Sequence, residues 1–146
     1  MKTNKRSSAS RLLLCSLFFL CAFPLLAQTD TLRGHWICRE QGLHLYLDLG
    51  EESLLVPRYE FFGPVNGYMN GKVSDTWFLT TFKPLQHGVW TMRFSNDSGA
   101  DTQEARLTIN ADGALAYKCV GTNYLRRSVR RKWEYLPTEM LFERVK

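Results

Sequence analysis

The chain has 146 residues and carries 19 Lys and Arg against 14 Asp and Glu, a formal net charge of +5. Four of the cations and none of the acids fall in residues 1–27, so the remaining 119 residues hold 15 basic and 14 acidic side chains. This near balance argues against a nucleic-acid-binding domain, which needs a clear excess of cations. A hydrophobic share of 45% argues against disorder, and the length suits one domain.

Residues 1–27 predict a secretory signal peptide. The first eleven residues are polar and basic, the next twelve are apolar except for one serine, and Ala27 is a small residue suited to cleavage. The apolar run is shorter than the roughly 20 residues that a spanning helix needs, although an uncleaved anchor is the alternative. We therefore expect a secreted or periplasmic protein with a single mature domain, residues 28–146, and no membrane span within it.

Two cysteines, Cys38 and Cys119, lie outside the predicted leader. Export takes a protein into an oxidising compartment, so an even pair predicts a disulfide. Closing the 82-residue loop between them would contribute about 2–4 kcal/mol. Two separate buried thiols are the alternative. Neither cysteine has a second one at the spacing of a zinc site, so we expect no metal there.

Apolar and polar residues alternate through most of the mature domain, which is the pattern of strands with one buried face. No stretch of ten or more residues keeps a helical stripe, and a single turn around residues 122–127 is the best helix candidate. In chain order, we expect strands over residues 34–39, 43–49, 54–62, 76–82, 90–94, 105–109, 115–119, 129–136 and 140–145.

Turn-forming residues separate these runs. Asp112-Gly113 lies between two alternating segments and is the strongest hairpin signal in the chain. About eight to ten strands with frequent turns predict an all-β fold, a small antiparallel up-and-down barrel. An immunoglobulin-like sandwich is the alternative, because Tyr117-Lys118-Cys119 matches that fold's Tyr-x-Cys. Further turns or loops are expected at Asn66-Gly67, Asn70-Gly71 and residues 50–53, 85–88 and 95–102.

Gly34-His35-Trp36 resembles the Gly-x-Trp motif on the first strand of lipocalin-like barrels, the calycins. In that family the tryptophan closes one end of the barrel beneath a basic residue from near the last strand. The resemblance thus implies this role for Arg131 or Arg144. It also implies a barrel over residues 32–146 that holds a small ligand. Simple core packing of Trp36 is the alternative interpretation.

Motifs for catalysis are missing from the sequence. The three histidines, His35, His44 and His87, have no partner at metal-ligand spacing. No serine sits in a Gly-x-Ser-x-Gly context, and no glycine-rich phosphate loop occurs. We therefore expect a protein that is not an enzyme and that carries no metal or cofactor.

The first binding hypothesis is a small apolar or amphipathic ligand held inside the barrel. An eight-stranded barrel is just wide enough to hold one small ligand or to be filled by its own side chains. Filling of the core by the aromatic residues is the alternative. The expected ligand-lining residues are Trp36, Tyr59, Phe61, Trp77 and Trp90.

The second hypothesis is a solid-cored interaction module. Five cations within seven residues create a local field even on a nearly neutral protein, and aromatic residues flank them. Such a cluster would dock on an extracellular protein, a glycan or another anionic surface. A charged edge strand that deters pairing with other chains is the alternative. The cluster comprises Arg126, Arg127, Arg130, Arg131 and Lys132.

Overall fold

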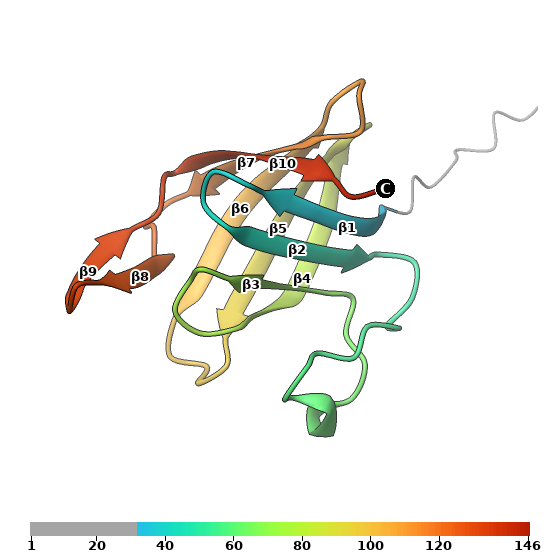
Figure 1. Ribbon diagram of the computed structural model, residues 1–146. Helices are drawn as coiled ribbons and strands as arrows, with labels where there is room; N and C mark the ends of the chain where they lie inside the picture. Colours follow the sequence, from blue (N-terminus) through green and yellow to red (C-terminus); the bar gives the residue numbers. More distant parts are fainter. Residues whose placement is uncertain (1–31) are drawn as a thin grey trace, which may run out of the picture.

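The computed structural model describes residues 32–146, so the predicted leader lies outside the described residues. Eight antiparallel strands close into a barrel in the order β1-β10-β7-β6-β5-β4-β3-β2, and β8 pairs only with β9 (Figure 1). The predicted all-β antiparallel barrel is confirmed. The strands are β1 (Arg33–Cys38), β2 (Leu43–Asp48), β3 (Gly67–Gly71), β4 (Trp77–Gln86), β5 (Val89–Asn96), β6 (Thr102–Ile109), β7 (Leu115–Val120), β8 (Arg126–Val129), β9 (Lys132–Tyr135) and β10 (Glu139–Arg144).

The alternation seen in the sequence places one face of each barrel strand in the interior. In β2, Leu43, Leu45 and Leu47 are buried inside the barrel, whereas His44 and Tyr46 point outward. Large side chains fill the interior, as expected for a barrel of this size. The largest fully buried residues include Trp36, Trp77, Phe94, Phe142, Leu107 and Leu115.

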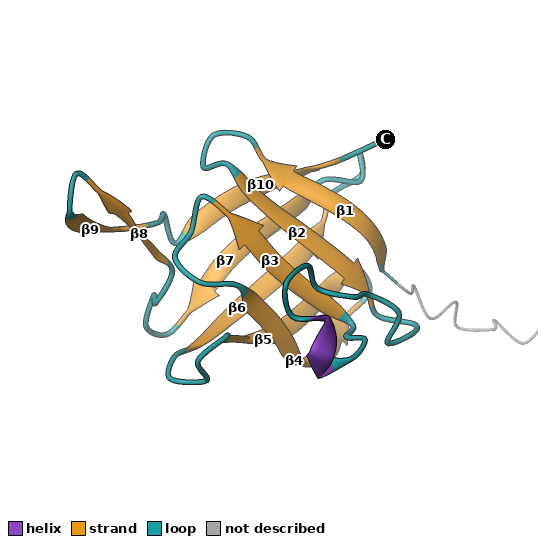
Figure 2. Ribbon diagram, turned by 60° about the horizontal axis from the view of Figure 1, so that its bottom comes forward, coloured by secondary structure: helices purple, strands orange, loops and turns teal. Residues whose placement is uncertain are grey.

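The β2–β3 connection differs from the prediction. Residues 54–62 form a loop that ends in a short 3-10 helix, η1 (Glu60–Phe62), and not a strand (Figure 2). Strand β3 was not expected, because its glycines read as turn signals. They serve close packing instead: a Cβ on Gly71 would lie 2.3 Å from the carbonyl oxygen of Gly42 on the β1–β2 turn.

Two further local predictions are corrected, and one is confirmed. The strand predicted over residues 129–136 is interrupted by a tight turn at residues 130–131, so that β8 ends at Val129 and β9 begins at Lys132. The helical turn expected at residues 122–127 is extended chain that leads into β8, and Leu136 N–H donates to the Leu125 carbonyl there. The turn at Asp112-Gly113 connects β6 and β7 as predicted.

The expected disulfide is absent, because Cys38 and Cys119 are both free thiols. Strand β10 lies between the two strands that carry them. Ile37 faces Glu143, whereas Cys119 N–H donates to the Thr138 carbonyl. The offset along the strands is therefore about 13–16 Å, in addition to two strand spacings of roughly 4.8 Å. A disulfide needs Cα atoms within about 7 Å, so the barrel register keeps these cysteines apart.

Candidate functional site

Strands β8 and β9 form a hairpin that projects from one end of the barrel (Figures 1 and 2). We call residues 126–135 the hairpin. Directly paired residues share a face, so the register separates two sets of side chains. One face carries Arg126, Ser128, Trp133 and Tyr135, and the other carries Arg127, Val129, Lys132 and Glu134.

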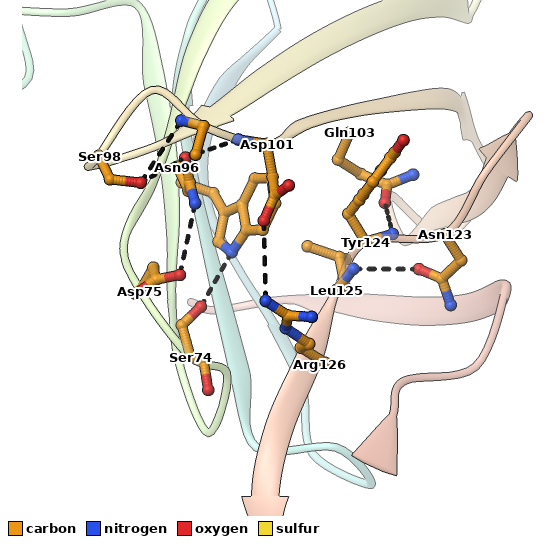
Figure 3. Close-up of polar contacts among 12 residues, drawn as sticks. Ser74, Asp75, Asn96, Ser98, Asp101, Gln103, Asn123, Tyr124, Leu125 and Arg126 are labelled. Atoms are coloured by element: carbon orange, nitrogen blue, oxygen red, sulfur yellow. Dashed lines mark hydrogen bonds and ion pairs between the residues drawn. The ribbon is translucent and has the colours of Figure 1, made fainter. Parts of the chain in front are cut away.

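Two of the predicted cluster cations fix the base of the hairpin to the barrel. Arg126 Nη2 lies 3.9 Å from Asp101 Oδ2 (Figure 3), and its guanidinium carbon lies 4.7 Å from the ring centroid of Trp133. Arg127 donates to the backbone carbonyl and the side-chain oxygen of Gln41, both at 3.2 Å. These two arginines are therefore already engaged within the chain.

The segment that leads into the hairpin is also held in place (Figure 3). Tyr124 N–H donates to Oε1 of the fully buried Gln103 at 2.8 Å, and Leu125 N–H donates to Asn123 Oδ1 at 3.2 Å. Leu125 and Leu136 are buried in the barrel core. The hairpin thus rises from a fixed base.

The tip of the hairpin carries the other three cations, Arg130, Arg131 and Lys132. Their side chains are exposed and make no ion pair or hydrogen bond with any of residues 32–146. Arg130 and Arg131 form the two-residue turn with φ of 49° and 65°. This left-handed conformation costs a residue with a Cβ roughly 1–2 kcal/mol. The sequence showed five equivalent cations, whereas the structure separates two anchors from three free charges.

Exposed aromatic residues accompany these cations. Trp133 is 59% exposed and Tyr135 is 58% exposed, on the same face of the hairpin. By contrast, Trp36, Trp77 and Trp90 are buried. Trp, Tyr and Arg are the residue types that most often dominate binding energy at interfaces. The hairpin therefore has the composition of a binding surface.

The predicted ligand-lining residues lie in two separate places. Trp36, Trp77 and Trp90 belong to the buried core of the barrel. Tyr59 and Phe61 lie on the β2–β3 loop outside it, where Phe61 is 77% exposed. The structure therefore does not bring these five residues together around one interior space.

Trp36 is fully buried in the barrel core and contacts the β6–β7 turn. Its indole N–H donates to the Gly113 carbonyl at 3.0 Å, and the Arg144 guanidinium carbon lies 5.6 Å from the indole ring. Of the two arginines that the resemblance suggested, Arg144 is the one that lies over the Trp36 ring, whereas Arg131 lies at the hairpin tip. A Cβ on Gly34 would approach Trp36 Cη2 to 3.1 Å, so glycine leaves room for the ring.

A histidine pair escaped the sequence interpretation. His35 Nε2 and His44 Nδ1 lie 3.0 Å apart on the outer face of β1 and β2, and the His35 ring stacks on Tyr46 with centroids 4.1 Å apart. Burial lowers the pKa of His35, with a smaller contribution from His44. The sequence could have indicated this pair, because both histidines occupy outward-facing positions on two strands that a single turn connects.

A groove of about 610 Å³ separates the hairpin from the barrel. Lys72 and Arg127 line it together with Glu40 and Glu134, so its charge is mixed. Within residues 32–146, no group of three or more His, Cys, Asp or Glu side chains is placed to hold a metal ion. No helix in this range has the length and apolarity to cross a membrane.

The chain was compared with protein-family models, with curated proteins and with solved structures, and none of the three comparisons gave a match.

Proposed function

We propose that this protein is an exported, lipocalin-like barrel that acts as a binding module and not as an enzyme, and that its hairpin docks on an anionic partner. One observation carries the proposal: Arg130, Arg131 and Lys132 lie at the tip of a projecting hairpin whose base is fixed, and their side chains have no partner among residues 32–146. The arrangement of Gly34, Trp36 and Arg144 supports the lipocalin likeness.

The free cations supply the attraction and the aromatic residues supply contact area. A unit charge pair at 4 Å contributes about 1 kcal/mol in water and more where water is excluded. Arginine forks bind carboxylate, sulfate or phosphate oxygens in pairs, which adds direction to the attraction. Burial of the exposed Trp133 and Tyr135 then stabilises the contact. The filled barrel core supports docking by the surface over capture of a ligand inside.

The proposal is tested by removing the tip charges. We expect Arg130→Ser, Arg131→Ser and Lys132→Ser together to weaken binding to heparin by at least about tenfold at low salt, because three of the charge contacts are lost. Binding of the unaltered protein should fall as salt screens the charges. Isothermal titration at several salt concentrations measures both effects.

The matched control removes the same charge elsewhere. Lys83, Arg106 and Lys146 are exposed cations away from the hairpin. Changing these three to serine should leave heparin binding nearly unchanged. Equal losses in the two triple variants would mean that only net charge matters, and the proposed function would be wrong.

Binding of a ligand inside the barrel is a second candidate function, and one unsatisfied hydroxyl group supports it. The hydroxyl of Tyr117 is buried and has no hydrogen-bond partner among the described residues. The polar end of an amphipathic ligand would satisfy it. A shift of the buried tryptophan fluorescence on addition of fatty acids would support this function, and no response to them would count against it.

A further inference from the structure

We infer that the anionic partner of the hairpin is the surface of an anionic lipid bilayer, on which the face carrying Trp133 and Tyr135 lies at the level of the headgroups. The inference rests on the proposed function, because it takes the hairpin as the docking element. It adds the chemical class of the partner and the orientation of the hairpin on it.

The exposed aromatic face of the hairpin has the chemistry of residues found at membrane interfaces. Tryptophan and tyrosine have an apolar body with one polar group, and both are enriched where a membrane meets water. Trp133 and Tyr135 are each more than half exposed and share their face with Arg126 and Ser128. No residue of the hairpin itself contributes a carboxylate to this face, and Asp101, which precedes β6, lies beside Arg126 at its base.

The only acid of the hairpin is on the opposite face. Glu134 pairs there with Arg127, whose Nε lies 3.9 Å from Glu134 Oε2. The negative charge is thus turned away from the aromatic face and neutralised by a neighbour. The aromatic face thus carries one cation, Arg126, and the opposite face carries Arg127 and Lys132 with Glu134. The charges of Arg130 and Arg131 lie in the turn between the two faces.

The tip of the hairpin places its three cations farthest from the barrel. Arg130, Arg131 and Lys132 extend past the aromatic residues at the end of the hairpin, on long apolar stems that let their charges reach phosphate groups. Each Lys or Arg near an anionic membrane raises binding by roughly fivefold. Figures 1 and 2 show the hairpin projecting away from the barrel, so a flat surface can approach it.

The backbone of the β8–β9 turn adopts a strained, left-handed conformation at two arginines. A two-residue hairpin turn with positive φ at both positions is formed best by Asn-Gly. Here both positions are arginine, Arg130 and Arg131. A turn needed only to connect β8 and β9 would be less strained with other residues. Strained positions of this kind concentrate at functional sites, and here they hold the charges that the bilayer would bind.

Trp133 makes the inference directly measurable. Because Trp36, Trp77 and Trp90 are buried, a change in the surroundings of an exposed indole reports on Trp133. We expect a blue shift of the emission with phosphatidylglycerol vesicles, reversed by salt, and no shift with pure phosphatidylcholine vesicles. The Trp133→Phe variant should lose the shift but still sediment with phosphatidylglycerol vesicles. An equal shift with both lipids, or no shift with either, would overturn the inference.

A turn variant separates binding from folding. We expect Arg130→Asn with Arg131→Gly to raise the thermal midpoint, because the turn strain is relieved, while vesicle binding falls by at least about tenfold. The matched control is Arg58→Gly with Lys83→Asn, which removes the same charge. Arg58 also has a positive φ, 74°, but lies on the β2–β3 loop. The control should gain stability and keep its binding to vesicles.

The outcomes distinguish the two proposals. Heparin binding that depends on the tip, without binding to phosphatidylglycerol vesicles, overturns the bilayer inference and leaves the proposed function standing with an acidic protein or glycan as partner. If neither probe binds, both proposals fail. Vesicle binding that the turn variant retains would show that another surface contacts the lipid, which also overturns the inference.

Discussion

Tyr117 places a polar hydroxyl group in the apolar interior of the barrel. It lies on β7 opposite Leu107 and Met140, with 3% of its surface exposed. Its hydroxyl has no hydrogen-bond partner within residues 32–146, and burial raises the pKa of the phenol far above its usual range. An unsatisfied buried hydroxyl loses its bonds to water without compensation.

Replacing Tyr117 with Phe should therefore stabilise the barrel. We expect Tyr117→Phe to raise the free energy of unfolding by about 1 kcal/mol, measured by urea denaturation. The ring remains and only the unsatisfied oxygen is removed, so no cavity of any size is left. A loss of about 1 kcal/mol would mean that the hydroxyl has a partner in solution, which would favour a ligand or water inside the barrel.

One histidine of the β1–β2 hairpin, His35, has surroundings that predict a pH-dependent stability. In the folded protein the rings of His35 and His44 share one hydrogen bond at 3.0 Å, and burial lowers the pKa of His35 below its ordinary value of 6.5. The unfolded chain therefore binds protons more readily than the folded one. The free energy of unfolding must fall as pH drops through 6.5 toward the lower folded pKa.

This pH dependence of stability should become weaker when His35 is replaced. We expect the stability of the unaltered protein to decrease between about pH 7 and about pH 5, and His35→Gln to flatten that decrease. Chemical denaturation at each pH gives the measurement. An unaltered slope in His35→Gln would assign the effect to other groups.

Elements with a clear period of two were predictable from the sequence, and elements that depend on distant contacts were not. The alternation at Leu43, Leu45 and Leu47 identified β2, because each residue's exposure follows directly from its position in the strand. Strand β3 was missed because Gly67 and Gly71 are selected by the backbone they approach, and only the tertiary structure supplies that neighbour.

The same limit applies to the candidate site. The sequence located the basic cluster, since charge density is visible without a fold. It could not separate the anchored Arg126 and Arg127 from the free Arg130 and Arg131, because Asp101 and Gln41 are contributed by other parts of the chain. It also predicted a disulfide from the number of cysteines, which says nothing of strand register.

At the scale of the whole molecule, the free thiols predict that reducing agents do not change the stability of the protein. We expect dithiothreitol to leave the thermal midpoint unchanged, since Cys38 and Cys119 are unlinked. Burial raises the pKa of the Cys38 thiol, so this buried sulfur should react slowly with thiol reagents in the native state. Unfolding should expose both thiols. A clear drop of the midpoint under reduction would contradict the arrangement of β1, β10 and β7.

The position of β10 also determines when the molecule can fold. Among the strands of residues 32–146, β10 is the last in sequence order, yet it is the one that joins β1 to β7. Until Glu139–Arg144 has been synthesised, the nascent sheet keeps two open edges that can pair with other chains. Closure of the barrel must therefore wait until β10 has been synthesised, and a chain that stops before β10 would aggregate through these edges and would not form a smaller barrel.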